Sequence, residues 1–187
     1  QSDLLDRCRS ECGSKRMKDA LLASPIFKSV KDTELIGVAG ISNMHLFSTG
    51  QKIIREGDPG RSLFIILDGR VTVSIRDHAG KEFELATLEP NQFFGEMAFL
   101  TGEPRSSTVT TLEECLLSEV SYSSMRKLVV RFPQIKDVLL KYFHERVEDS
   151  RKKRAEAGLE NRRRYVRLNE RLLVKFNVTP EPHLPEE

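Results

Sequence analysis

One stretch of the chain combines residue types that could bind a small anion. Residues 93–108 read FFGEMAFLTGEPRSST. Gly95 would allow a tight turn and the close approach of a ligand to the backbone. The residues from Glu96 to Leu100 could form one helical turn, whose free N–H groups favour an anion.

The side chains that follow this turn add to the same chemistry. Arg105 comes after a Gly-Glu-Pro turn that would fold the chain back, and two hydroxyls, Ser106 and Ser107, follow it. One arginine with hydroxyls and amides suits a singly charged phosphate, and the carboxylate of Glu96 suits a sugar hydroxyl. A triphosphate would require a G-x-x-x-x-G-K-[ST] loop, which the sequence lacks. The residue types alone are also those of a surface helical turn capped by Glu and Arg.

The elements around this stretch fall into three zones. Up to about Ile41 the pattern is helical, with a break at Pro25. From about Asn43 to Ser121 short β-rich runs alternate with turn residues, which predicts an antiparallel sandwich or barrel. Asp68-Gly69 lies between two apolar runs and predicts a hairpin. The fold class is therefore mainly β with flanking helices, in a jelly roll-like antiparallel β-barrel.

The third zone returns to helix. Ser121 is a suitable N-cap for a helix that Pro133 ends. A second apolar stripe follows at helical spacing: Ile135, Val138, Leu139, Tyr142, Phe143 and Val147. Gly158 interrupts it, and a last helix is expected over residues 161–176. We expect four segments: a helical lead-in (1–42), a β-barrel core (43–121), hinge and lid helices (122–157), and a basic helical extension with a disordered tail (158–187).

The order and spacing of two motifs resemble the cyclic nucleotide-binding domain family, which includes protein kinase A regulatory subunits and catabolite activator proteins. Residues 93–108 resemble the family's phosphate-binding cassette. Residues 57–73, GDPGRSLFIILDGRVTV, resemble its glycine-punctuated hairpin, and Ser24-Pro25-Ile26-Phe27 resembles its helical lead-in. The resemblance covers about Ala20 to Phe143. Phe99 and Ser107 stand where the family more often has Leu and Ala.

The resemblance implies a ligand and the residues that bind it. Glu96 should accept a hydrogen bond from the ribose 2′-hydroxyl, and Arg105 should pair with the exocyclic phosphate oxygens. Backbone amides around Met97, Ala98 and Ser107 should complete the phosphate cradle. The full expected set is Phe94, Gly95, Glu96, Met97, Ala98, Arg105, Ser106, Ser107 and Val109.

Two details of the ligand site stay open in the sequence. A hydroxyl after the arginine, here Ser106, can contact guanine or phosphate in the family, and cAMP is favoured over cGMP. The helix after the barrel usually caps the base, and the candidate lid residues are Tyr142, Phe143, Arg146 and Val147. The alternative is that Tyr142, Phe143 and Val147 only pack this helix onto the barrel or a partner chain.

Composition sets further limits. The 187 residues hold three cysteines, Cys8, Cys12 and Cys115, which favours a reducing compartment over a disulfide framework. No apolar run approaches the ~20 residues that span a bilayer, and no secretory signal precedes the domain, so we expect a cytoplasmic protein. The chain starts Gln-Ser-Asp, as a fragment of a larger protein would.

Other functions have weaker support. A cupin-type enzyme needs convergent metal ligands, whereas His45, His78, His144 and His183 are scattered, so we expect no metal, no cofactor and no catalysis. A ligand-free barrel that serves oligomerisation or protein interaction remains an alternative. Residues 151–175 hold ten Lys or Arg and three Glu. Three roles are open for this basic segment. It is expected to be a solvated helical face; the alternatives are a docking surface for an acidic partner and, least expected, a nucleic acid or lipid site. A homodimer is reasonable, and the effector is not named by the sequence.

Overall fold

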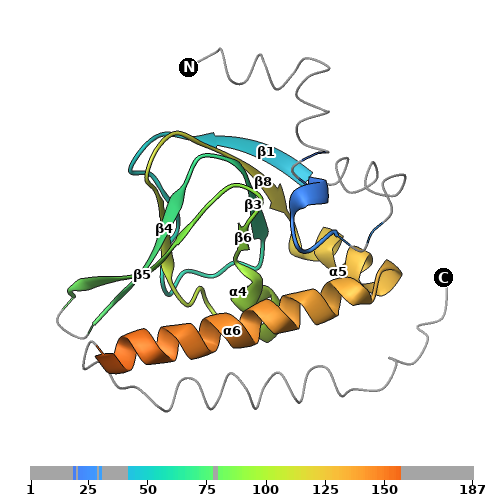
Figure 1. The fold of residues 1–187 in the computed structure, drawn as a ribbon. Coiled ribbons are helices and arrows are strands. Elements are labelled where there is room, and N and C mark those ends of the chain that lie inside the picture. Colours follow the sequence, from blue (N-terminus) through green and yellow to red (C-terminus); the bar gives the residue numbers. More distant parts are fainter. Residues whose placement is uncertain (1–18, 20, 29, 31–41, 78–79, 157–187) are drawn as a thin grey trace.

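Two antiparallel sheets and a set of helices make up the computed structural model, which describes residues 19, 21–28, 30, 42–77 and 80–156 (Figure 1). The first sheet has the strand order β1-β8-β3-β6 and the second β2-β7-β4-β5. The strands of the two sheets are β1 (Ser42–Phe47), β2 (Lys52–Ile54), β3 (Leu63–Asp68), β4 (Val71–Arg76), β5 (Glu82–Leu88), β6 (Phe93–Phe94), β7 (Thr108–Thr111) and β8 (Cys115–Val120). This mainly β architecture with flanking helices confirms the predicted fold class, and the strands pair as two separate sheets.

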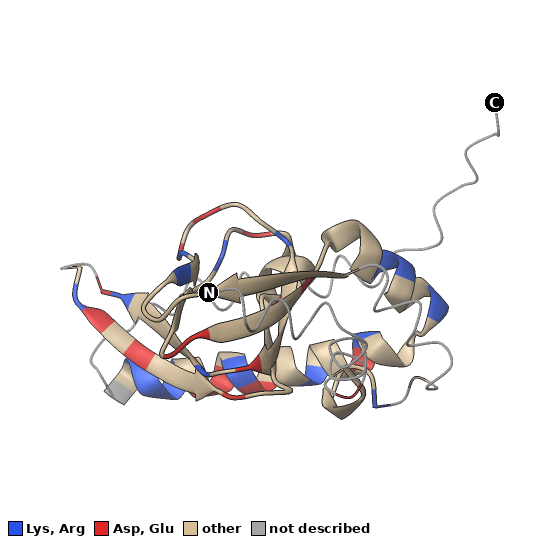
Figure 2. Ribbon diagram, turned by 90° about the horizontal axis from the view of Figure 1, so that it is seen from above, with Lys and Arg blue, Asp and Glu red and all other residues tan. Residues whose placement is uncertain are grey.

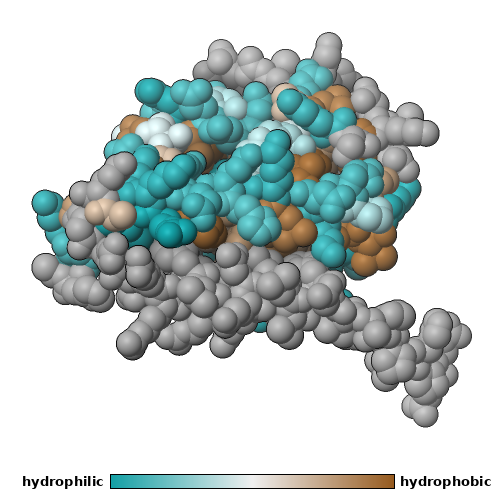
Figure 3. Space-filling model, turned by 60° about the horizontal axis from the view of Figure 1, so that its bottom comes forward, coloured by the Kyte–Doolittle hydropathy of each residue, from teal (hydrophilic) through white to brown (hydrophobic). Residues whose placement is uncertain are grey.

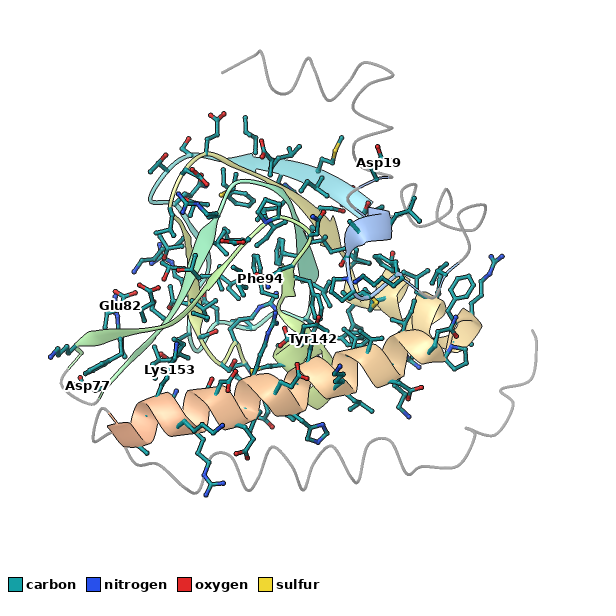
Figure 4. All side chains as sticks on the ribbon, in the orientation of Figure 1. Asp19, Asp77, Glu82, Phe94, Tyr142 and Lys153 are labelled. Atoms are coloured by element: carbon teal, nitrogen blue, oxygen red, sulfur yellow. The ribbon has the colours of Figure 1, made fainter. Side chains whose placement is uncertain are left out.

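Strand β3 is buried on both faces, and this explains its continuous apolar run. Alternate side chains point to opposite faces of a strand. Leu63 and Ile65 therefore join the core between the first sheet and the helices, whereas Phe64 and Ile66 join the core between the two sheets. The neighbouring pair on β6 divides in the same way, with Phe93 towards the helices and Phe94 between the sheets (Figure 4).

The Asp68-Gly69 turn does not form the predicted hairpin. Strand β3 pairs with β6 and β8 in the first sheet, whereas β4 pairs with β5 and β7 in the second. The turn instead carries the chain from one sheet to the other. Gly69 has a φ of 83°, and a Cβ there would lie 2.5 Å from the Glu114 carbonyl oxygen. Gly69 has the positive φ that the sequence predicts for this turn, but the sheet that the next strand joins depends on long-range pairing.

The helices that follow β1 along the chain are α4 (Glu96–Thr101), α5 (Tyr122–Arg131) and α6 (Gln134–Glu156), and residues 19 and 21–23 before β1 are also helical. The side chain of Ser121 accepts a hydrogen bond from the Ser124 amide at 3.2 Å, so the predicted N-cap is confirmed. Pro133 separates α5 from α6, as predicted. Helix α6 runs along one side of the sheets, with α4 between them (Figure 1).

The helical lead-in is described at Asp19, residues 21–28 and Val30. Leu21, Ile26 and Phe27 have no exposed surface and pack in the same core as α5 and α6. Several sequence predictions fall outside the described residues: Cys8, Cys12, His78, His183, Gly158 and the helix over residues 161–176. Most of the basic segment 151–175 also lies outside them.

Candidate functional site

Helix α4 is held between two left-handed glycines that set its start and its end. Gly95 has a φ of 89° and Gly102 a φ of 72°. A Cβ on Gly95 would lie 2.7 Å from the Ser62 carbonyl oxygen and 2.8 Å from Arg105 Nη1. Glycine is therefore required here both by the backbone conformation and by the closeness of the two neighbours. The absence of a side chain on Gly95 thus allows Arg105 to lie close to the start of α4.

Arg105 is fixed by backbone groups on two sides. Its Nη1 donates to the Ser62 carbonyl oxygen at 2.8 Å and to the Gly95 carbonyl oxygen at 3.4 Å. Its own amide donates to the Asp58 carbonyl oxygen at 2.9 Å, and its carbonyl accepts from the Gly57 amide at 2.9 Å. The glycine-rich loop before β3 thus positions a residue that lies more than forty positions later in the chain.

The charge of Arg105 is buried without a matching carboxylate. Only 5% of the residue is exposed. Burial lowers the pKa of its guanidinium, and the nearby carboxylates of Glu119 and Glu96 oppose that shift. The group still carries its charge at neutral pH, because an arginine pKa lies far above 7. Within the described residues, no carboxylate lies within ion-pair distance of it. A buried cation in this state favours an anionic ligand.

Glu96 is the most deeply buried carboxylate of the site. It is 2% exposed, and its Oε2 lies 2.7 Å from Nη1 of Arg146 on α6. Its second oxygen, Oε1, is buried and has no hydrogen-bond partner in the described part of the chain. Because a carboxylate oxygen only accepts hydrogen bonds, Oε1 is available to a donor such as a hydroxyl group.

Arg146 connects α6 to the sheet and to α4. Besides the Glu96 carboxylate, it contacts the Phe93 carbonyl oxygen through Nη2 at 2.6 Å. Its guanidinium also lies 4.9 Å from the centre of the Phe93 ring and 5.7 Å from that of Tyr142. These contacts make Arg146 the polar anchor of the middle of α6 on the domain.

Arg105 and Glu96 both line one pocket, which lies between α4, the second sheet and α6. The space between its walls is about 890 Å³ when the open mouth is counted. All nine residues of the predicted ligand set line it: Phe94, Gly95, Glu96, Met97, Ala98, Arg105, Ser106, Ser107 and Val109. Ser106 Oγ lies 3.1 Å from Met97 Sδ inside the pocket.

The four candidate lid residues separate into two groups. Arg146 lines the pocket. Phe143 is fully buried and Val147 is 4% exposed, and both belong to the core between the helices and the first sheet. Tyr142 packs its ring edge-on against Phe93, 5.0 Å between ring centres, and points from α6 towards the sheets (Figure 4). The packing alternative raised by the sequence therefore describes these three side chains in this structure.

The pocket has further walls that motif reasoning missed. The second sheet contributes apolar residues, and α6 contributes polar residues beyond the apolar stripe: Ile54, Val73, Leu85, Ala86, Leu88, Asp149, Ser150 and Arg154. The helical signal was present, because residues 149 and 150 lie three and four positions after residue 146, and residue 154 lies four positions after residue 150, so they share one face. Lys153, nearby on α6, donates to the Leu85 carbonyl oxygen and joins this end of α6 to β5.

The described residues hold no group of three or more His, Cys, Asp or Glu residues that could bind a metal ion. None of the helices found there is long and apolar enough to cross a membrane. Cys115 is buried, and burial raises the pKa of its thiol, which makes it a poor nucleophile. The deeply buried charged groups that the pocket offers to a ligand are thus those of Arg105 and Glu96.

Two β-sheets with flanking helices and a pocket that holds a buried guanidinium and a buried carboxylate are the architecture of a small-molecule-binding domain, and comparison with known proteins gives its family. Residues 44–132 match the family model described as the cyclic nucleotide-binding domain. Residues 44–132 are therefore a domain of this family, and the resemblance stated from the sequence is confirmed.

The individual relatives are regulators and a channel. The chain is 28% identical over 131 residues to a CRP-like cAMP-activated global transcriptional regulator of Mycobacterium tuberculosis, covering 70% of this chain and 58% of the relative. It is 32% identical over 124 residues to a cyclic nucleotide-gated potassium channel of Rhizobium etli, covering 66% of this chain and 33% of the channel. The chain therefore spans only part of the length of these curated relatives.

Solved structures give the same family. The regulatory domain of Toxoplasma gondii PKA, crystallised with cAMP, is 28% identical with a TM-score of 0.59, covering 64% of this chain and 45% of that one. A structure titled Sp-2Cl-cAMPS bound to PKAR CBD2 is 28% identical with a TM-score of 0.64, covering 80% of this chain and 94% of that chain.

Proposed function

We propose that this chain is a non-enzymatic regulatory domain that binds a cyclic nucleotide, cAMP rather than cGMP, and passes the signal through α6 to an effector. The observation that carries the proposal is the buried Arg105 guanidinium, which opens into the pocket without a carboxylate partner among the described residues. The buried Glu96 lies in the same pocket and leaves Oε1 for a hydroxyl donor. A cyclic nucleotide carries one phosphate charge and one ribose hydroxyl, which matches this pair.

In this proposal each part of the ligand has its own wall. Arg105 pairs with the exocyclic phosphate oxygens, with the amides of Met97, Ala98 and Ser107 around them. Glu96 accepts from the ribose 2′-hydroxyl. The base lies along the apolar residues of β2, β4 and β5, which continue the pocket away from the charges: Ile54, Val73, Leu85, Ala86 and Leu88. Apolar walls with a few placed polar groups are typical of sites for small organic ligands.

We expect the purified chain to bind cAMP more tightly than cGMP in calorimetric titration. The names of the matched transcriptional regulators and the titles of the matched PKA structures support cAMP. Ser106 is the residue that would contact a guanine amino group, and one such hydrogen bond contributes only about 0.5–1.5 kcal/mol. Because that contact would favour cGMP, it should narrow the preference for cAMP by no more than about tenfold. Absence of heat and of competition with both nucleotides would contradict the proposed ligand.

For signalling, we place the core in residues 43–121 and the hinge and lid helices in residues 122–157. Arg146 supports this division, because it ties α6 to Glu96 at the centre of the pocket. A ribose hydroxyl on Glu96 would share or displace that contact, so the ligand and the position of α6 are coupled. A ligand shifts a conformational equilibrium only through its different affinities for the two states.

We therefore expect nucleotide to change the hydrogen-exchange protection of residues 121–156, and Arg146→Ala to reduce that change. The variant removes the polar anchor of α6 while leaving Phe143 and Val147 in the core. Arg151→Ala is the matched control, because Arg151 is 64% exposed and contacts only Glu148, at 3.7 Å on the same helix. Equal protection of these residues with and without nucleotide in the unmodified chain would refute transmission through α6.

A further inference from the structure

A second groove lies on the other side of α4, between α4, α5 and α6. It is lined by Phe99, Leu100, Tyr122, Arg126, Val129, Val130, Lys136 and Leu139. None of these residues lines the nucleotide pocket. The groove is therefore a separate surface that the proposed nucleotide site leaves unused, and below we name it the α5 groove.

The α5 groove brings apolar side chains to the surface. Val130 is 79% exposed, and the only other large hydrophobic residue that is exposed in the described part of the chain is Leu112, at 43%. Apolar atoms reach the surface on the side where α5 lies (Figure 3). Phe99 forms the inner wall, and its ring lies 5.4 Å from that of Tyr122. Exposed apolar surface rimmed by polar residues is typical of a protein interaction site.

The charge of this surface has one sign. Both charged residues that line the groove, Arg126 and Lys136, are cations. All charged residues of α5 are Lys or Arg, as Figure 2 also shows. Arg61 adds a further cation, since its guanidinium lies 5.1 Å from the Tyr122 ring centre. An occupant of complementary charge must therefore be acidic, which excludes the chain's own basic segment 151–175.

We propose that the α5 groove docks an acidic amphipathic helix of a partner protein. Two apolar side chains on one face of that helix would fill the space beside Phe99 and Val130, and carboxylates on its flanks would face Arg126. Such grooves recognise helices through apolar residues at i, i+3 or i+4, and i+7. The floor of the groove belongs to α4 and α6, the two helices that carry Glu96 and Arg146, so a docked helix would contact the elements that surround the nucleotide pocket.

The test uses the whole chain without nucleotide, so its result does not depend on the proposed ligand. The probe is a fluorescent synthetic helix of about four turns, with Leu at the i, i+3, i+4 and i+7 positions and Glu elsewhere. A second peptide has Lys in place of every Glu. Anisotropy titration should show binding of the Glu peptide, at least about tenfold weaker binding of the Lys peptide, and weakening of the former as salt rises from about 50 to about 300 mM.

Two surface variants locate the contact. Arg126→Glu and Val130→Asp should each weaken binding of the Glu peptide about tenfold or more. Leu112→Asp is the control for an exposed apolar residue elsewhere, and Lys152→Glu is the control for charge reversal on the exposed face of α6; neither should change binding. All four positions are exposed, so the thermal unfolding temperature of each variant should equal that of the unmodified chain. This measurement shows that differences in peptide binding do not come from unfolding.

Three outcomes would overturn the proposal. Equal binding of the two peptides, or none, would remove the acidic helix as the occupant. Loss of binding that is the same for the control variants would place the contact elsewhere. Self-association of the chain that Val130→Asp abolishes in sedimentation experiments, without peptide binding, would assign the groove to a second copy of this chain instead.

Discussion

Arg105→Ala should lower the affinity for cAMP by about 30-fold or more, which corresponds to roughly 2–5 kcal/mol for the loss of one partner from a desolvated ion pair. The expected effect is large for two reasons. Arg105 is 5% exposed, so water has little access to its place beside the phosphate. The other cations that line the pocket, Arg146 and Arg154, lie on α6 and not beside the loop that positions Arg105. Calorimetric titration of the variant measures the loss directly.

The comparison needs controls that separate binding from folding. Arg105 also donates to the Ser62 and Gly95 carbonyl oxygens, so the variant loses contacts of the fold as well. Arg105→Lys keeps a charge but cannot form two parallel hydrogen bonds to a phosphate, and should bind with intermediate affinity. Arg76→Ala, on the exposed end of β4, should bind as the unmodified chain does. A folded Arg105→Ala variant with an unchanged dissociation constant would end the assignment of Arg105 to the phosphate.

Phe143→Ala should reduce the free energy of unfolding by about 3–5 kcal/mol, as expected for a phenylalanine removed from a closed core. Its side chain is fully buried in the cluster that joins α6 to the first sheet. Urea denaturation of the ligand-free chain measures the change, and omitting nucleotide avoids the stabilisation that a bound ligand adds.

This variant also separates the two roles that the sequence left open for Phe143. A lid residue would lose affinity for nucleotide and keep the stability of the ligand-free chain, whereas a core residue loses stability first. Lys141→Ala is the matched control on the same helix: its side chain is 71% exposed, and the change should stay within about 0.5 kcal/mol. A Phe143→Ala variant as stable as this control would show that the core does not depend on the ring.

The local elements of the fold could be predicted because their causes are local. The N-cap at Ser121 and the break at Pro133 depend on neighbouring backbone groups only. The positive φ of Gly95 is also set by a turn of a few residues, although its closeness to Ser62 depends on long-range packing. The resemblance of residues 93–108 to a known cassette predicted that Glu96 and Arg105 lie in one site. All nine residues of the predicted ligand set line one pocket.

The predictions that failed or stayed open concerned long-range placement. The Asp68-Gly69 turn was recognised, yet β3 and β4 belong to different sheets, because strand pairing is decided by residues far away along the chain. Spacing identified the apolar stripe of α6 but not which face meets the pocket. Both Phe143 and Arg146 satisfy the same helical period, and only the position of α6 against Phe93 directs one into the core and the other to Glu96.

The sequence by itself determined the family resemblance and the mainly β fold class, and it predicts which residues bind an anion, because these depend on residue types at short spacing. Only the tertiary structure decided how the charges are compensated. It leaves Arg105 buried without a carboxylate partner among the described residues, pairs one oxygen of Glu96 with Arg146, and gathers Phe99, Val130 and Arg126 into the α5 groove. The physical reason is that burial and charge pairing depend on how sheets and helices pack together, and local spacing does not specify that packing.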